Sequence, residues 1–569
     1  MKKKTCLLPS ILLVLLSCAS HSPGLAASSL PTSNPEGISS STELSSETPS
    51  SSEAPHSSEK ENSSPMESSS SFMEKDEQGF VILPKGYLEK ETRAHSFGKD
   101  VENKEKSANL RLFLGDEPVP VYGVHVNVTH SWDPEAKLRE LVGVASVSIS
   151  SGAKFTLQCT WVMDGRCKIM PSSSGVGLDF DETHRTVQFE ITKPGDYVVS
   201  YRGNRALHLF VHSYEEASPY NESNCIYFGP GVHNKNNDRR LANNSTVSLS
   251  SNQTVYLAEG AFVEGAFISN GTENVRILGK GFVDGSVFDR NATTGSRFIP
   301  FDFNDCSSFQ FDSFAVLDPA GWCFNLYFCR DFSLNGVKVI SSRSNGDGIS
   351  LQSCRNATVD GCFVRTYDDS IVVKNYPRWN NRSIEGASEH IEVKNCLIWT
   401  DLAQCLEIGY ETVGTKMEDI YFHDTTILGA YHKAAISIHN ANNAAIKNVR
   451  FEEILIENLQ TGLGDGSPLL LEFTVAHSPT WSDQHKVTGL GSIDGVKVKN
   501  VTVLAGLESP RISIQGSMET RSQYPKEAHY IRNVELENII IRGKRVNHSY
   551  VSFAFAYAEN VLLDGEKLV

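Results

Sequence analysis

The chain has 569 residues, 40% of them hydrophobic, and a formal net charge of −16 at neutral pH. This length is enough for two domains or one large core. The acidic balance argues against a nucleic-acid partner, because the basic surface that such a partner requires is missing. Val, Ile, Thr and Phe are frequent and helix-forming runs are scarce, so the composition favours an all-β fold.

Residues 1–27 have the pattern of an export signal. A run of lysines precedes an apolar stretch, 7–16, that is too short to span a bilayer as a helix. The stretch 15–18 resembles a bacterial lipobox, in which Cys18 would become a lipid anchor. Simple secretion after cleavage near Ala27 stays equally open. Either route predicts a secreted or cell-surface protein, facing the periplasm or the exterior if it is anchored to an outer membrane.

Residues 28–107 are expected to form a disordered tether. Between 28 and 71 the chain is dominated by Ser, with Pro, Glu and Thr and almost no large apolar side chains. Such a segment cannot bury enough surface to offset the entropy cost of ordering. It would serve as a flexible spacer between an anchor and the folded part.

Residues 108–215 show short alternating strands separated by turns. A Pro-Gly-Asp turn at 194–196 is one of the separators. Strands of this length and spacing predict a small β-sandwich, which we assign to a separate domain. The clearest strands are 145–149, 155–159, 186–191 and 197–201.

Residues 220–569 carry a repeat. Short segments with an alternating apolar core start roughly 23 to 35 residues apart, the period of a solenoid coil. One coil cannot bury its apolar face alone, so stacked coils supply the core of a parallel β-helix. The residues that end the segments fit tight turns, where left-handed backbone is tolerated. The uneven period and the lack of a blade signature argue against a β-propeller. The segments are 274–279, 331–336, 356–361, 390–395, 419–424, 448–453 and 533–538.

The spacing of the cysteines predicts a role in core packing more than in disulfides or metal binding. Cys159 and Cys167 could bridge a hairpin, since export permits disulfides. Four cysteines that recur near the coil period are expected to be small buried residues of the core. No cysteine or histidine spacing matches a zinc site, so neither a metal nor another cofactor is expected. The four recurring residues are Cys306, Cys329, Cys354 and Cys396.

Two consecutive coils place carboxylates in register. When Ile349 is laid on Ile371, Asp347 falls on Asp369, 22 residues later, which is about one coil. Neighbouring strands lie about 4.8 Å apart. Asp347, Asp368 and Asp369 are therefore expected to lie close together.

Three close carboxylates cannot all titrate normally, because like charges raise at least one pKa. One group can then stay protonated as a general acid while another is ionised and activates water. This is the environment that glycoside hydrolysis requires. The Asn-Gly-Asp-Gly motif at 345–348 could be explained as a tight turn with no role in catalysis. A turn does not explain why the pair Asp368-Asp369 lies in register with it one coil later.

Five stretches between residue 227 and the C-terminus resemble the polygalacturonases, glycoside hydrolase family 28, and the related dextranase and isopullulanase family 49. The resemblance implies a right-handed, pectin-lyase-like parallel β-helix and an inverting hydrolase. It also implies that Asp368 is the general acid, and that Asp347 and Asp369 hold and deprotonate the attacking water. The stretches are 227–233, 251–256, 279–285, 345–348 and 367–371.

The chain departs from the polygalacturonase pattern at three positions. Gln404 stands where the family carries the His of a Gly-His-Gly motif, and Ser437 and His439 replace the cations of an Arg-Ile-Lys motif. Losing two fixed cations removes the obvious means of binding a polyanion. The departures favour a neutral or differently charged poly- or oligosaccharide, dextran-like as readily as pectin-like.

The alternation of inward and outward side chains along each strand identifies the other candidate site residues. If the apolar residues point inward, one outward column contains Gln352, Lys374 and His439, and another contains Glu407. Tyr410, Trp322 and Trp399 could stack on sugar rings or serve as packing. Residues 462–490 are expected to form a long loop. The expected substrate-binding residues are Asn345, Gln352, Lys374, Gln404, Glu407, Tyr410 and His439.

Two alternatives to an inverting hydrolase stay open. A β-helical polysaccharide lyase would need a Lys or Arg base, often with Ca²⁺. A non-catalytic, glycan-binding surface protein would fit the Gln404 departure and the tether. The hydrolase is favoured because it uses the aspartate trio, and it is expected to act as a monomer on a poly- or oligosaccharide.

Overall fold

The computed structural model describes residues 73–203, 205–215, 223–376, 386–480 and 487–569. The expected export signal with Cys18, and the Ser-rich segment up to residue 72, lie outside this range. The described chain is almost entirely β-structure, with two short 3₁₀ turns, η1 (Ser172–Ser174) and η2 (Arg239–Leu241). None of its helices is long and apolar enough to cross a membrane.

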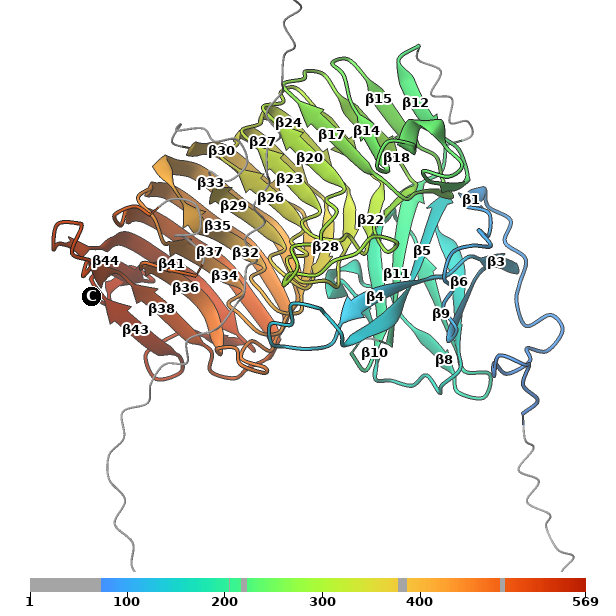
Figure 1. The fold of residues 1–569 in the computed structure, drawn as a ribbon. Coiled ribbons are helices and arrows are strands. Elements are labelled where there is room, and N and C mark those ends of the chain that lie inside the picture. Colours follow the sequence, from blue (N-terminus) through green and yellow to red (C-terminus); the bar gives the residue numbers. More distant parts are fainter. Residues whose placement is uncertain (1–72, 204, 216–222, 377–385, 481–486) are drawn as a thin grey trace, which may run out of the picture.

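The N-terminal part is a β-sandwich, drawn in blue and cyan in Figure 1. A core of alternating apolar residues, including Leu112, Val147 and Phe155, is buried in it. One sheet contains β1 (His95–Phe97), β4 (Tyr122–Asn127), β5 (Arg139–Ile149), β7 (Cys167–Met170), β10 (Gly195–Tyr201) and β11 (Arg205–Ser213). The other contains β2 (Leu110–Leu114), β3 (Glu117–Val119), β6 (Ala153–Cys159), β8 (Asp179–Asp181) and β9 (Thr186–Ile191).

The expected tether boundary at residue 107 is wrong. Phe80 and Val81 are buried, and the side chain of Gln158 donates a hydrogen bond of 2.6 Å to the Val81 carbonyl. Strand β1 pairs with β5. Residues 73–107 therefore pack on the sandwich, because they carry the apolar side chains that the Ser-rich segment lacks.

The rest of the chain is a right-handed parallel β-helix whose coils stack in sequence order (Figure 1). One sheet has 11 strands: β14 (Thr246–Ser248), β17 (Ala266–Asn270), β20 (Phe301–Asn304), β23 (Phe324–Tyr327), β26 (Ile349–Gln352), β29 (Ile371–Asn375), β32 (Leu406–Thr412), β34 (Ile436–Asn440), β36 (Leu469–Val475), β38 (Arg511–Gln515) and β43 (Ser552–Ala556). A small hairpin, β39 (Ser517–Met518) with β40 (Ala528–His529), follows β38.

The other faces of the helix form a continuous 21-stranded sheet. The chain bends between these faces while its strands stay hydrogen-bonded to those of the neighbouring coils. Early coils contribute two strands each: β12 (Cys225–Phe228), β13 (Gly231–His233), β15 (Thr254–Leu257), β16 (Ala261–Val263), β18 (Arg276–Gly279), β19 (Phe282–Asp284), β21 (Gln310–Asp312), β22 (Ala315–Leu317), β24 (Arg330–Asn335), β25 (Lys338–Ile340), β27 (Arg355–Asp360), β28 (Phe363–Thr366), β30 (Gly386–Lys394) and β31 (Leu397–Thr400). Later coils have long bent strands, and short strands end the sheet: β33 (Gly414–Ala430), β35 (Ala445–Leu459), β37 (Ser492–Gly506), β41 (Ile531–Ile541), β42 (Lys544–Arg545), β44 (Ala558–Leu563) and β45 (Glu566–Lys567).

The bends occur where the repeat segments begin and end. All seven segments start and finish on a residue with positive φ, for example Asn448 at 51° and Glu453 at 53°. Gly, Asn and Asp fill most of these positions because they tolerate left-handed backbone best. The repeat and its turns, predicted from the sequence, are confirmed.

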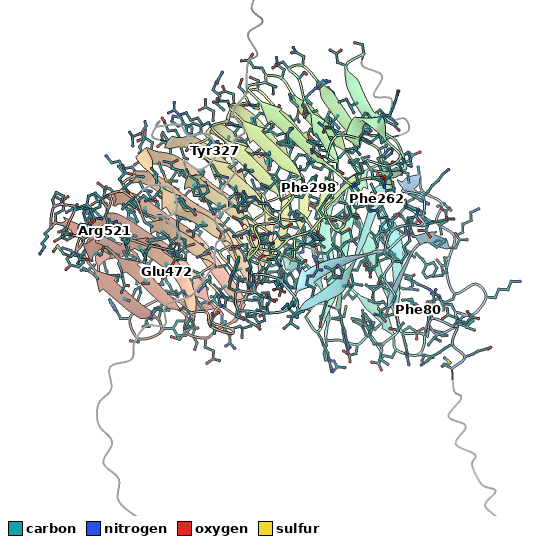
Figure 2. All side chains as sticks on the ribbon, in the orientation of Figure 1. Phe80, Phe262, Phe298, Tyr327, Glu472 and Arg521 are labelled. Atoms are coloured by element: carbon teal, nitrogen blue, oxygen red, sulfur yellow. The ribbon has the colours of Figure 1, made fainter. Side chains whose placement is uncertain are left out.

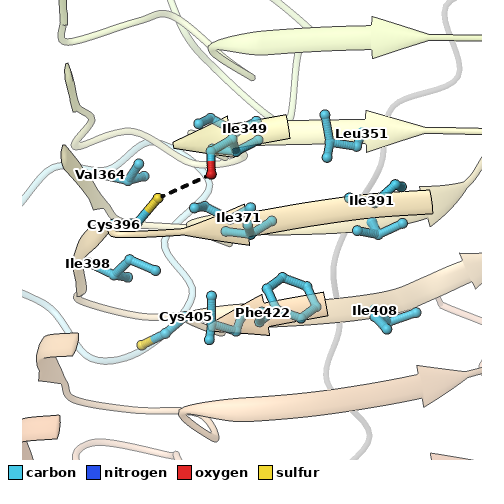
Figure 3. Close-up of a cluster of buried hydrophobic side chains, with 14 of the residues drawn as sticks. Ile349, Leu351, Val364, Ile371, Ile391, Cys396, Ile398, Cys405, Ile408 and Phe422 are labelled. Carbon is cyan, nitrogen blue, oxygen red and sulfur yellow. Dashed lines mark hydrogen bonds between the residues drawn. The ribbon is translucent and has the colours of Figure 1, made fainter. Parts of the chain in front are cut away.

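The helix interior is apolar, and Figure 3 shows side chains of successive coils stacked in it, Ile349 on Ile371 in one sheet and Val364 on Ile398 in the other. The four recurring cysteines are buried in this core, as expected. Cys159 and Cys167 are both free thiols, so they form no bridge.

The sandwich packs closely on the β-helix. A shared apolar cluster joins residues of the sandwich, such as Phe210, to residues of the helix, such as Phe262 and Phe363. Phe262 lies where the two domains meet (Figure 2). Lys104 of the sandwich also pairs with Glu264 at 2.6 Å. The contact surface is therefore an apolar core with buried charge pairs.

Candidate active site

The three aspartates lie just before adjacent strands of the 11-stranded sheet. Ile349 of β26 pairs with Ile371 of β29, so Asp347 and Asp369 occupy equivalent positions in neighbouring coils. The Gly348 amide donates to the Asp369 carbonyl at 2.8 Å. The predicted register of the two coils is confirmed.

Backbone amides hold the aspartate side chains. Asp368 accepts hydrogen bonds from the amides of Asn345 and Asp369, both at 3.1 Å. Asp369 accepts one from the Gln404 amide at 3.4 Å. Asn345 and Gln404 thus contact the trio through their backbones, and the Asn345 side-chain oxygen accepts a hydrogen bond from Arg290.

Lys374 supplies the positive charge beside the trio. Its Nζ lies 3.4 Å from Asp347 Oδ2, 3.4 Å from Asp369 Oδ2 and 3.6 Å from Glu411 Oε2. Burial alone would lower the pKa of Lys374, but these carboxylates hold that pKa well above its usual range. Lys374 is therefore a fixed ammonium.

Burial and neighbouring charges shift the pKa values of two of the aspartates. Burial raises the pKa of Asp347 well above its usual range, against the opposing charge of Lys374. Burial also raises the pKa of Asp368 to about 7, and the charge of Asp369 adds to the rise. Asp347 Oδ1 is buried and accepts no hydrogen bond from any described residue. The trio can therefore keep a proton near neutrality while offering an oxygen to a bound hydroxyl or water.

A second polar cluster lies on the next coils. His439 Nδ1 lies 2.7 Å from Glu407 Oε1, and its Nε2 lies 3.3 Å from Glu472 Oε2. Burial would lower the pKa of His439, but Glu407 and Glu472 raise it to about 10. The Tyr410 ring stacks on the His439 ring at a centroid distance of 4.1 Å, and Ser437 donates to Glu407. His439 is thus an imidazolium whose charge is matched by its own neighbours.

The remaining sequence candidates are Gln352 on the coil of Asp347, Trp322 one coil earlier, and Trp399 in the domain interface. Gln352 pairs with Lys374 in register, and its side chain donates to Asn325 one coil earlier. Trp322 is two residues before Phe324, which pairs with Ile349, so it occupies the coil position next to Asp347. Trp399 is buried in the cluster shared with the sandwich, so packing accounts for it.

Sequence reasoning missed two carboxylates of the site. Glu411 reaches Lys374 because β32 carries three residues, 409–411, opposite the single Lys374 of β29, and an irregularity of this kind leaves no mark in the repeat. Glu472 belongs to β36 (Figure 2), inside the stretch expected to be a long loop. That expectation is wrong for residues 469–475, which form a strand whose residues 471–475 alternate apolar and polar side chains as the other strands do.

The part of the chain that the structure describes has no group of three or more His, Cys, Asp or Glu arranged to hold a metal ion.

Residues 233–468 match the model of the family described as Glycosyl hydrolases family 28. The match covers less than half of the chain, but the aspartate trio and the whole second cluster except Glu472 lie within it. The β-helix is thus the domain of a glycoside hydrolase, a class that acts on glycans. The match confirms, over these residues, the resemblance to family 28 that was inferred from the motifs. No curated protein sequence matches the chain.

Among the solved structures that are similar to this chain, three illustrate the low level of identity. The exopolygalacturonase of Thermotoga maritima is 16% identical, with a TM-score of 0.45 over 60% of this chain and 85% of that one. Dex49A from Penicillium minioluteum is 12% identical, with a TM-score of 0.46 over 86% and 94%. The polygalacturonase of Erwinia carotovora ssp. carotovora is 13% identical, with a TM-score of 0.42 over 62% and 99%. Similarity at this level carries no argument about the substrate.

Proposed function

We propose that this protein is an inverting glycoside hydrolase that cleaves a neutral poly- or oligosaccharide. The observation that carries the proposal is the buried trio of Asp347, Asp368 and Asp369 beside the fixed ammonium of Lys374.

Asp368 is the proposed general acid. Its pKa of about 7 keeps it largely protonated in mildly acidic solution, so it can donate to the leaving oxygen. Asp369 is the proposed base, because its carboxylate lies 3.4 Å from Lys374 Nζ and accepts a hydrogen bond from the Gln404 amide, which leaves it next to the acid in the trio. Asp347 would hold the attacking water through its unpartnered Oδ1. These roles agree with those that the family resemblance implies.

The charges around the trio support a neutral sugar. A uronate needs a cation that is not already committed, and Lys374 is shared by three carboxylates. His439 lies between Glu407 and Glu472, so its charge is also matched. A galacturonate carboxylate brought beside these groups would be repelled.

The lyase alternative is weaker because it requires a neutral basic side chain. Lys374 is the lysine that forms ion pairs with Asp347 and Asp369, and its carboxylate neighbours hold its pKa well above the usual range. A lyase would release an unsaturated product that absorbs in the ultraviolet, and a glycan-binding protein would release no product.

A polysaccharide panel with product analysis tests the proposal. We expect new reducing ends from a neutral glycan, with dextran and pullulan as first probes, and little release from polygalacturonate. Proton NMR of the first product should show inverted anomeric configuration. Preferred cleavage of polygalacturonate, or an unsaturated product, would overturn the assignment.

The proposed secreted or cell-surface location, with or without a lipid on Cys18, has a separate test. Expression of the full chain and of a Cys18→Ser variant, followed by fractionation and mass spectrometry of the mature N-terminus, distinguishes lipidation from simple cleavage.

A further inference from the structure

One segment of the sandwich, residues 127–134 between β4 and β5, lies against the turns that carry the aspartates. The Asn127 side chain donates to the Ser342 carbonyl at 3.1 Å. The Ser344 hydroxyl donates to the Pro134 carbonyl at 2.8 Å. Both helix residues belong to the turn that leads into Asp347, so this turn is held from the sandwich at two points.

The next turn is held through Tyr367, the residue before Asp368. The Tyr367 hydroxyl donates to the Ser131 carbonyl at 2.5 Å and accepts from the Asp133 amide at 3.0 Å. The Trp132 ring lies nearly parallel to the Tyr367 ring, with centroids 6.5 Å apart. Tyr367 is fully buried, and both hydrogen-bonding capacities of its hydroxyl are used by the sandwich.

A third turn has a similar link. His130 Nδ1 lies 3.3 Å from the Asp401 carbonyl, three residues before Gln404. Three successive coils that contribute to the site therefore each contact the same segment of the other domain. This pattern is more than a general domain contact, because it follows the site coil by coil.

The interface behind the segment is suited to hold it in place. Phe210 of the sandwich is buried against Phe363 of the β-helix, with ring centroids 5.5 Å apart. Arg365, which is fully buried, lies 3.6 Å from Asp401 and 3.3 Å from His208 of the sandwich. Domains joined by a small polar interface move relative to each other by default, but an apolar buried one resists such motion.

We propose that the sandwich is a working part of the active site, with Tyr367 as a positioning residue through which residues 127–134 set the place of Asp368. This inference rests on the proposed role of Asp368 as general acid. Displacement of a reacting group by about 1 Å can cost ~100-fold in rate. A tyrosine whose hydroxyl is fixed by another domain and whose backbone directly precedes the acid suits this task.

The test is Tyr367→Phe in the full chain. The variant keeps the ring against Trp132 and removes only the hydroxyl. We expect kcat on the glycan identified by the panel to fall about tenfold with little change in KM. Tyr431→Phe is the matched control, since Tyr431 also packs in this interface, against His130, but is not adjacent in the sequence to a residue of the trio.

A second substrate separates positioning from general damage. The 4-nitrophenyl glycoside of the released oligosaccharide has a leaving group that needs little help from a general acid. Tyr367→Phe should therefore lose much less rate on this substrate than on the glycan, and the alkaline limb of its pH–rate profile should move. Equal losses on both substrates, or wild-type kcat on the glycan, would overturn the inference.

Two further variants keep the outcomes separate. If Tyr367→Phe does not fold, Trp132→Phe perturbs the same contact from the sandwich side and must show the same selective loss. An Asp368→Asn variant with near-normal activity would instead contradict the proposed function itself, whatever Tyr367→Phe does.

Discussion

At the residue scale, Lys374 determines how much negative charge the site can carry. It lies within 4 Å of Asp347, Asp369 and Glu411, and its side chain is 10% exposed. Removing one partner of a buried charge group costs about 3–5 kcal/mol, because the other charges are left uncompensated.

Lys374→Met should therefore lower both stability and activity. We expect the melting temperature at pH 8 to fall by several degrees, and kcat to drop at least tenfold, because Asp347 and Asp369 lose the cation that lies 3.4 Å from each of them. Lys416→Met is a suitable control, since Lys416 is a more exposed lysine in ion pairs with Glu389 and Glu418. Exposed pairs contribute about 0–1 kcal/mol, so thermal melts that show similar losses for both variants would contradict this account.

The pH dependence of the reaction follows from Asp368. Its pKa is raised to about 7, and a general acid works only while it is protonated. The ratio kcat/KM should therefore decline as pH rises through about 7. A profile measured from pH 4 to 10 that stays flat above pH 8 would exclude Asp368 as the acid.

At the scale of elements, the turns of the coils determine the register that brings Asp347 and Asp369 together. Asn448 is one such turn residue, with φ of 51° and a hydrogen bond of 3.3 Å from its side chain to Asp419 one coil earlier. Left-handed backbone costs most residues roughly 1–2 kcal/mol and costs glycine almost nothing.

Asn448→Val should destabilise the protein by about 1–2 kcal/mol, whereas Asn448→Gly should be nearly neutral. Denaturant unfolding of the two variants measures the difference. Equal stabilities would mean that the left-handed turn does not limit the fold.

Much of the β-helix could be predicted from the sequence because its repeat is local. The apolar pair of each segment and its terminal Asn, Asp or Gly are enough to align Ile349 with Ile371, and thereby two of the aspartates. The same reasoning failed at β32 and β36, where a bulge and an irregular coil length hide Glu411 and Glu472. Local patterns also say nothing about contacts across domains, so Tyr367 and residues 127–134 were not found.

At the scale of the whole molecule, the sandwich and the β-helix share an apolar cluster. Phe262, Phe282 and Phe363 of the helix are at most 2% exposed in the intact chain. Removing the sandwich would place these rings in water at a cost of about 25 cal/mol for each Å² uncovered.

We expect the two domains to unfold together. Scanning calorimetry of the mature protein should show one cooperative transition, and a chain that starts at residue 223 should be insoluble or prone to aggregate. Two well-separated transitions, or a soluble and folded β-helix alone, would show that the interface is not part of the stable unit.

The central claim is that the aspartate trio of the β-helix hydrolyses a glycan, and Asp368→Asn tests it most directly. The variant keeps the size of the side chain and removes the acid. Asp331→Asn is the control, since Asp331 sits at a partly exposed left-handed turn that Asn also tolerates. On the glycan identified by the panel, reducing-end release should fall at least 1,000-fold for Asp368→Asn and stay unchanged for Asp331→Asn. Near-normal release by a folded Asp368→Asn protein would contradict the claim.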